Sequence, residues 1–245
     1  MKTRKKIQLF CLPFAGGSKA IFKNFQEYIA EEIEIVLIEY PGHDSRISEA
    51  FCEEIEELVE DVLEQIIQKR NKNLPFAILG YSMGSVLAYE LLSRIYNFNI
   101  SLIGTPVHLF LCAIEALSNF KPRIDFKNME RQKAIEILTN MGGIENNILK
   151  NERFLEVFLR PIKADYELLS NYRFSKKAVV PKVDGSIIFS NEDTPYYKVE
   201  DWKYLINGEV EFYEMGNNHF FINQCSKDLA ELINGKLLDC VKEAN

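Results

Sequence analysis

Ser82 is the residue of this chain whose surroundings best suit nucleophilic chemistry. It lies in Gly80-Tyr81-Ser82-Met83-Gly84, after an apolar run with strand character at 76–79 and before a helical pattern at 86–92. On so sharp a strand-to-helix turn, glycines two residues before and after the serine leave room for the backbone and let the hydroxyl point outward. We therefore predict that Ser82 is a nucleophile carried by this turn.

A serine hydroxyl is a weak nucleophile and needs a base, and the sequence holds three histidines. His219 follows the last predicted strand and precedes the last predicted helix, where chains with this serine turn carry their base. His108 lies inside an apolar strand pattern, and His43 follows Tyr40-Pro41-Gly42 on a loop. We predict that His219 is the general base and that the other two histidines are not.

The histidine in turn needs an acid that fixes its tautomer and stabilises its cation. In chains with this serine turn the order is Ser, then Asp or Glu, then His, and Asp193 fits that order. It follows a predicted strand at 185–190, so it should lie at the carboxyl edge of a parallel sheet. Glu192, its neighbour, and Glu115, which follows the strand predicted at 107–113, stay open as alternatives.

Acyl transfer also requires N–H donors for the oxyanion that forms on the attacked carbonyl group. The backbone N–H of Met83, directly after the nucleophile, is one candidate. The glycine-rich loop 13–18 follows the first predicted strand, and the N–H of Ala15 is our candidate for the second donor. Dispersed histidines and the absence of phosphate-loop patterns argue against a metal site and a nucleotide site, so we expect no metal and no cofactor.

The elements that would position these residues alternate along the chain. Strand patterns at 7–12, 33–40, 76–80, 107–113, 185–190 and 210–213 are separated by helical patterns at 22–31, 55–70, 85–96 and 229–238. This alternation predicts an α/β fold with a mostly parallel central sheet flanked by helices. It breaks between about residues 118 and 173, where helical segments near 129–141 and 151–171 predict a helical lid insertion.

Composition narrows the class of protein. The 245 residues, 47% of them hydrophobic, predict one domain over 1–245, and a formal charge of −7 argues against nucleic acid or an anionic membrane as partner. Five cysteines without a C-x-x-C pair favour a reducing cytoplasm over a disulfide framework. No apolar run approaches the roughly 18 residues of a membrane span.

Several segments together resemble a known family. They are Leu12–Ser18, Tyr40-Pro41-Gly42-His43-Asp44-Ser45-Arg46, the serine turn, Arg160–Tyr166, Glu192-Asp193 and His219-Phe220-Phe221. In this order they resemble the type II thioesterases, which have the α/β-hydrolase fold and remove wrong or stalled acyl groups from carrier proteins of nonribosomal peptide and polyketide synthases. The resemblance implies the same roles for Ser82, Asp193 and His219, and a lid over 118–173.

The chain departs from the family pattern in two places. It has Tyr-Pro-Gly-His43 where the family commonly has Leu-Pro-Gly-Arg, and Cys112–Leu117 where the family has a Ser-Gly…Ala-Pro stretch. These departures affect local loop shape and the contacts near the entrance. They also keep Glu115 open as an acid.

The leading functional hypothesis is hydrolysis of acyl or aminoacyl thioesters on the phosphopantetheine arm of a carrier protein by a monomeric enzyme. A medium-chain fatty-acyl carrier-protein thioesterase and a small-molecule carboxylesterase are the alternatives, because fold and triad do not fix the acyl group. A catalytically inactive binding module is disfavoured by the intact Ser, Asp and His. Carrier proteins are usually acidic, so docking would need a local basic or apolar patch, for which the basic residues between 153 and 177 are candidates.

Overall fold

The computed structural model describes residues 5–98, 103–121, 126, 129–140, 152–175 and 180–243. Its centre is a six-stranded sheet in the order β2-β1-β3-β4-β5-β6, in which every pairing is parallel. The strands are β1 (Ile7–Leu12), β2 (Ile33–Leu37), β3 (Phe76–Tyr81), β4 (His108–Cys112), β5 (Asp184–Phe189) and β6 (Val210–Glu214). The predicted α/β class with its mostly parallel sheet is confirmed.

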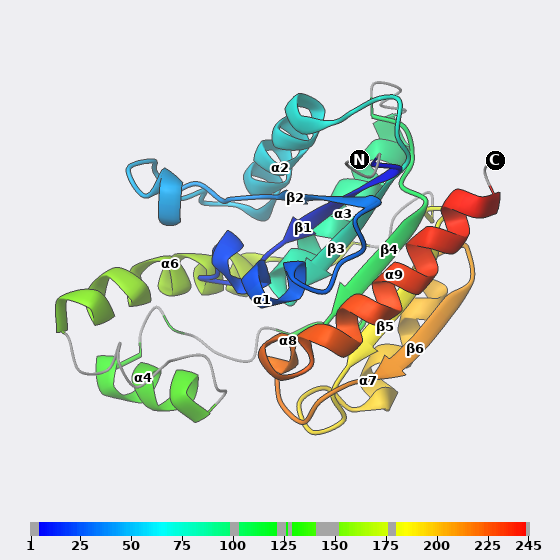
Figure 1. The fold of residues 1–245 in the computed structure, drawn as a ribbon. Helices are drawn as coiled ribbons and strands as arrows, with labels where there is room; N and C mark the ends of the chain where they lie inside the picture. Colours follow the sequence, from blue (N-terminus) through cyan, green and yellow to red (C-terminus); the bar gives the residue numbers. More distant parts are fainter. Residues whose placement is uncertain are drawn as a thin grey trace.

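Helices cover both faces of this sheet (Figure 1). The α-helices are α1 (Lys23–Gln26), α2 (Ile55–Lys69), α3 (Met83–Phe98), α4 (Arg131–Asn140), α6 (Glu152–Asn171), α7 (Tyr196–Val199), α8 (Phe221–Gln224) and α9 (Ser226–Glu243). The short 3-10 helices are η1 (Lys19–Phe22), η2 (Asp44–Arg46) and η3 (Glu200–Tyr204). None of these helices is long and apolar enough to cross a membrane.

The two faces of the sheet bury two separate hydrophobic clusters. In β3, Phe76 and Ile78 join the cluster formed with α2, α3 and the end of α6, while Ala77 and Leu79 join the one formed with α1 and α9. Successive strand side chains point to opposite faces, so burial on both sides needs a continuous apolar run. This is why the strand sequences are apolar throughout.

Two elements end earlier than their sequence patterns predict. The strand expected to reach Tyr40 ends at Leu37, because the chain then leaves the sheet edge for the Pro41-Gly42 turn. The helix expected at 22–31 is replaced by η1 and the four-residue α1. After Gln26 the chain continues in tight turns, such as Tyr28 N–H to Phe25 O at 3.2 Å, before β2 begins.

The predicted insertion contains α4 and α6, which extend beyond the sheet (Figure 1). The first half of α6 and α4 share a small cluster of their own, formed by Phe126, Ala134, Leu138, Leu155, Leu159 and Ile162. The second half of α6 instead packs on the main core through Leu168 and Leu169. Pro161 lies inside α6 without ending it. Within the insertion, residues 122–125, 127–128 and 141–151 fall outside the described ranges.

Candidate active site

Ser82 lies at the junction of β3 and α3 in a backbone conformation that is uncommon for a residue with a side chain. Its φ is +51°, in the left-handed region. A Cβ on Gly84 would fall 2.2 Å from the carbonyl oxygen of Leu12, and one on Gly80 would fall 2.4 Å from that of Gly84. The two glycines therefore allow the close approach that the turn needs, as the sequence predicts.

Ser85, which the sequence analysis does not single out, braces the same turn. Its buried hydroxyl donates to Gly80 O at 2.8 Å and accepts from Cys112 N–H at 3.1 Å, while Ser82 N–H donates to Cys112 O at 2.8 Å. These bonds tie the turn to the end of the neighbouring strand β4. Such a brace offsets the cost of roughly 1–3 kcal/mol of holding Ser82 at positive φ.

The structure brings the three predicted side chains together. His219 Nε2 lies 3.1 Å from Ser82 Oγ, and His219 Nδ1 lies 2.8 Å from Asp193 Oδ2. Ser82 and His219 are 137 residues apart in the chain, so their meeting depends on the fold. Both the histidine and aspartate side chains are mostly buried, with exposed fractions of 12% and 19%.

These contacts fix how His219 can act. A carboxylate oxygen only accepts hydrogen bonds, so Nδ1 carries the hydrogen and Nε2 is left to accept the hydroxyl hydrogen of Ser82. Asp193 itself is held by the turn after β5, where its N–H donates to Ser190 O at 3.1 Å, and its Oδ2 also accepts from Thr194 Oγ1 at 2.9 Å. The arrangement can remove a proton from Ser82 and can stabilise the resulting imidazolium.

Tyr81 is a further residue of the site that sequence reasoning missed. Its hydroxyl donates to His219 O at 2.8 Å and accepts from Ile222 N–H at 3.2 Å. Because Tyr81 directly precedes Ser82, this side chain joins the serine turn to the histidine loop. The partner lies 138 residues away, and no local pattern could have indicated it.

The two predicted oxyanion donors follow the ends of neighbouring strands, Met83 after β3 and Ala15 after β1. Met83 is the first residue of α3, so its N–H has no acceptor within the helix and lies at the positive end of the helix dipole. Ala15 lies in the loop after β1, whose last residue Leu12 is in register with Gly80 of β3. Phe14 of this loop contacts the ring of Phe220, next to His219, with ring centroids 4.9 Å apart.

The competing acids have other surroundings. Glu192 is exposed, and its neighbour Asp193 contacts the histidine in its place. Glu115 is buried, with an oxygen 3.8 Å from Lys198 Nζ. Lys198 belongs to α7.

A second serine and histidine also meet. His108 Nε2 lies 2.9 Å from Ser186 Oγ, but both residues are buried, at 4% and 0% exposure, near the amino ends of β4 and β5. Burial lowers the pKa of His108 to about 4. This pair is shielded from any substrate, as expected of a core histidine.

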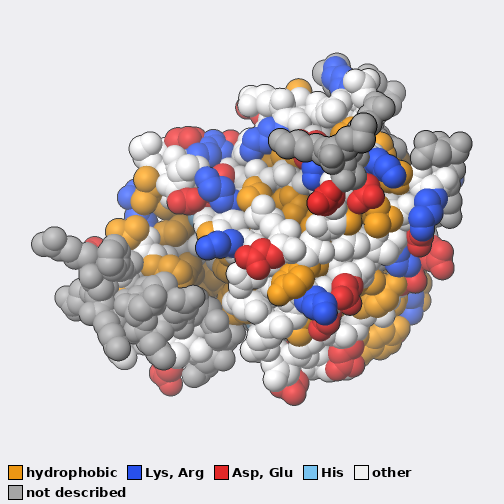
Figure 2. Space-filling view, in the orientation of Figure 1, with side chains coloured by type: hydrophobic (Ala, Val, Ile, Leu, Met, Phe, Trp, Pro, Cys, Tyr) orange, Lys and Arg blue, Asp and Glu red, His pale blue; other side chains and the backbone are white. Residues whose placement is uncertain are grey.

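The predicted basic patch is less uniform in the structure than in the sequence. A cleft of about 1040 Å³ between the start of α2 and α6 is lined by Arg160 and Arg173, but also by Glu53, Glu54, Glu56 and Glu167. On the face shown in Figure 2, positive and negative side chains are interspersed with hydrophobic ones. Lys176 and Lys177 lie outside the described residues.

Within the described ranges, no three His, Cys, Asp or Glu side chains come together in a way that could hold a metal ion.

Comparison with known proteins gives a consistent result. The model of a family described as "Thioesterase domain" matches residues 7–237. The chain is 25% identical to the gramicidin S biosynthesis protein GrsT of Aneurinibacillus migulanus, over 93% of this chain and 88% of that protein. It is equally identical, at 25%, to the medium-chain S-acyl fatty acid synthase thioesterase of Anas platyrhynchos, over 90% of this chain and 87% of that protein.

A solved structure gives the same picture of the fold. ClbQ, from the colibactin NRPS/PKS pathway, superposes with a TM-score of 0.85 at 21% identity and covers 98% of this chain and 100% of that one. The six-stranded parallel sheet and its flanking helices therefore form the α/β-hydrolase fold that ClbQ also has.

Proposed function

The chain belongs to the thioesterase domain family, and on that basis we propose that it hydrolyses acyl thioesters with Ser82 as nucleophile, His219 as general base and Asp193 as the orienting acid. The observation that carries this proposal is the position of His219, whose two ring nitrogens face Ser82 Oγ at 3.1 Å and Asp193 Oδ2 at 2.8 Å. Among the described residues, Ser186 also contacts a histidine, His108, but that serine is fully buried, whereas Ser82 is partly exposed.

In the first half of the reaction, Ser82 Oγ attacks the thioester carbonyl carbon while its proton passes to His219 Nε2. The oxyanion that forms is stabilised by the N–H groups of Met83 and Ala15. The intermediate then collapses, the carbon–sulfur bond breaks, and the thiol leaves with the proton from His219. The product of this half is an acyl ester on Ser82.

In the second half, water attacks the ester carbonyl and gives a proton to His219. The same oxyanion donors serve again, and collapse returns the proton to Ser82 Oγ as the free carboxylic acid departs. The two halves need only the residues of this chain and water.

The thioester proposed as substrate is an acyl or aminoacyl group on the phosphopantetheine arm of a carrier protein. This rests on the resemblance of the motifs to the type II thioesterases and on relatives such as GrsT, which is named for gramicidin S biosynthesis. Docking of an acidic carrier on a chain of charge −7 would require a local surface, because the net charges repel. Monomeric state and cytoplasmic location stay predictions of the sequence.

We propose that the moving part of the lid is smaller than the whole interval 118–173. The separate cluster of α4 and the first half of α6 supports this, since these segments can shift without opening the main core. The second half of α6, with Leu168 and Leu169 in that core, would stay in place. Pro161 lies between the two halves. Because proline has no backbone N–H, the helix lacks one hydrogen bond at this boundary.

A fatty-acyl thioesterase is the second candidate. The observation in its favour is the equal identity, 25%, to GrsT and to the medium-chain fatty acid synthase thioesterase. Both candidates share the triad, so only the acyl group and its carrier distinguish them.

The test compares three substrates that carry the same acyl group: an acyl carrier protein thioester, a medium-chain acyl coenzyme A and an oxygen ester. We expect the highest kcat/KM for the carrier thioester, and loss of all three activities in Ser82→Ala. Ser93→Ala, a change of a buried serine further along α3, is the matched control and should keep wild-type activity. Preference for medium-chain acyl coenzyme A would favour the second candidate, and preference for the oxygen ester would point to a carboxylesterase.

A further inference from the structure

Asp165, on the second half of α6, connects this helix to the loop that carries Ala15. Its carboxylate is buried, and Oδ2 accepts a hydrogen bond from Gly16 N–H at 2.6 Å. The same oxygen lies 3.0 Å from His43 Nε2. The acidic group therefore touches the residue directly after a proposed oxyanion donor.

The helix also packs directly on Gly16. A Cβ built on this glycine would fall 2.1 Å from Ile162 Cγ1, so the backbone of the loop and the helix are in close contact. Ile162 and Asp165 are three residues apart and lie on one face of α6. The loop 13–18 thus packs against one face of α6, and a hydrogen bond from Tyr40 Oη to Pro13 O at 2.9 Å also holds it.

Both ring nitrogens of His43 face oxygen acceptors, which favours the imidazolium form beside Asp165. Its Nδ1 lies 2.9 Å from Pro41 O, which can only accept, so Nδ1 carries a hydrogen, and Nε2 donates to the carboxylate. Burial lowers the pKa of His43, but the hydrogen bond and charge of Asp165, the Pro41 carbonyl and the charge of Glu39 outweigh it, and the net pKa is raised. The other neighbours of the imidazole are the rings of Tyr40 and Phe51.

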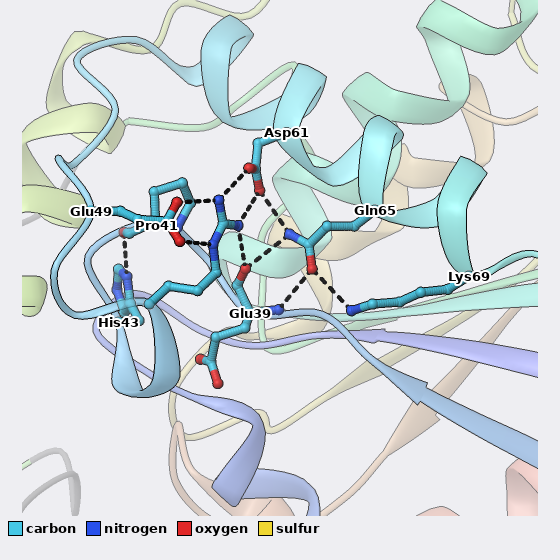
Figure 3. Close-up of polar contacts among 8 residues, drawn as sticks. Glu39, Pro41, His43, Glu49, Asp61, Gln65 and Lys69 are labelled. Carbon is cyan, nitrogen blue, oxygen red and sulfur yellow. Dashed lines mark hydrogen bonds and ion pairs between the residues drawn. The ribbon is translucent and has the colours of Figure 1, made fainter.

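The segment that carries His43 is itself firmly fixed, as Figure 3 shows. Arg46 pairs with Asp61 of α2 at 2.7 Å and donates to Glu39 O at 2.9 Å. Gln65 of α2 donates to the same carbonyl oxygen at 2.9 Å. His43 is therefore a fixed point against which Asp165 can be held.

Building on the proposed function, we propose that Asp165 is a positioning residue for acyl transfer. Paired with His43, it holds the Gly16 N–H and thereby keeps the Ala15 N–H directed at the oxyanion beside Ser82. Because of this pair, the position of the oxyanion loop depends on how α6 packs against it. The pair also makes catalysis depend on the charge of His43.

The dependence on pH has a definite sign. Because the His43 pKa is raised, the ion pair is fully present below the ordinary histidine pKa and is lost as the pH rises through the raised value. A neutral His43 still donates from Nδ1 to Pro41, so its Nε2 lone pair then faces the carboxylate. The anchor of Gly16 weakens, and kcat should fall on the alkaline side.

The test measures kcat and KM for a small acyl thioester of N-acetylcysteamine between pH 6 and 9. Asp165→Ala should lower kcat by about 10- to 100-fold with KM changed less than about threefold, since oxyanion contacts act mainly in the transition state. Asp165→Asn can still accept from Gly16 N–H and can donate to a neutral His43. It should recover most of kcat and lose the alkaline fall, and His43→Gln should lose that fall too.

His108→Gln is the matched control, because it changes another buried histidine with a hydrogen-bonded partner away from the site. It should lower thermal stability and leave both kcat and the alkaline fall as in the wild type. The proposal is overturned if Asp165→Asn and His43→Gln keep the wild-type alkaline fall, or if Asp165→Ala loses no more kcat than His108→Gln. A wild-type protein that hydrolyses no acyl thioester would instead overturn the proposed function on which this inference rests.

Discussion

Tyr81 donates its hydroxyl hydrogen to the carbonyl oxygen of His219 at 2.8 Å, which joins the residue before the nucleophile to the residue that serves as base. The same hydroxyl accepts from Ile222 N–H at 3.2 Å, so it closes the short loop between His219 and α8. The two halves of the site, from β3 and from the loop after β6, are therefore connected through one side chain as well as through the Ser82–His219 contact.

Tyr81→Phe should lower kcat by roughly 10-fold and the free energy of unfolding by about 1–2 kcal/mol. The change removes the donor to His219 and leaves the N–H of Ile222 without its acceptor in a buried place. Steady-state hydrolysis of a small acyl thioester and urea denaturation would measure the two effects.

Tyr96→Phe is the matched control for this change. Tyr96 also donates to a backbone carbonyl, that of Lys182, but lies roughly 20 Å from Met83 along the axis of α3. It should lose stability and keep kcat. Equal losses of kcat in the two variants would show that the Tyr81 hydroxyl has no special effect on His219.

Asp193→Asn should lower kcat by about 10³- to 10⁴-fold, because an amide cannot hold the Nδ1–H tautomer of His219. Glu115→Gln, which alters an acid paired with Lys198, should change kcat by less than about threefold. Both variants are compared by kcat at one pH, with circular dichroism as the check on folding. The opposite ranking would assign the acid to the end of β4.

Gly84→Ala should lower the free energy of unfolding by more than about 3 kcal/mol and reduce activity at least 100-fold. Its Cβ would fall 2.2 Å from Leu12 O, so either the turn or β1 must shift. Gly235→Ala is the control: this exposed glycine of α9 has no neighbouring atom within 4 Å of an added Cβ. It should raise the free energy of unfolding by about 0.5–1 kcal/mol and leave activity unchanged. A stable, active Gly84→Ala protein would contradict the tight turn.

His108 should make the protein less stable in acid. Burial lowers its pKa to about 4 in the folded state, against about 6.5 in an unfolded chain, so the unfolded state binds more protons between these values. The stabilisation from this group is complete above about pH 6.5 and falls, by on the order of 3 kcal/mol, as the pH drops to about 4.

Urea denaturation of the wild type and His108→Gln across this range isolates that effect, because the other titrating groups are common to both proteins. The difference in unfolding free energy between the two proteins should shrink as the pH falls. A difference that stays constant would show that His108 titrates at its ordinary pKa.

The sequence was sufficient where a property depends on neighbours along the chain. The strand, the glycines at 80 and 84, and the helix after Ser82 together predict the turn, and the order Ser82, Asp193, His219 follows from the arrangement of strand ends in a parallel sheet. The continuous apolar strand patterns likewise predict a sheet that helices cover on both faces, because successive side chains point to opposite faces. These predictions depend on local periodicity and on the topology that it implies.

The remaining parts depend on contacts between distant segments. Asp165 and Gly16 are 149 residues apart, and their contact requires the second half of α6 to lie on the loop after β1. In the sequence alone, Asp165 is one polar residue of an amphipathic helix, and His43 is one residue of a loop.

The most direct test of the account is to find where the acyl group resides during turnover. Enzyme mixed with excess acyl carrier protein thioester is quenched in acid within the first turnovers, digested, and the acylated peptide is mapped by mass spectrometry. We expect one adduct, on Ser82, together with release of the free carrier thiol, and no adduct in His219→Ala. An acyl group on another residue, or steady hydrolysis by a folded Ser82→Ala protein, would contradict it.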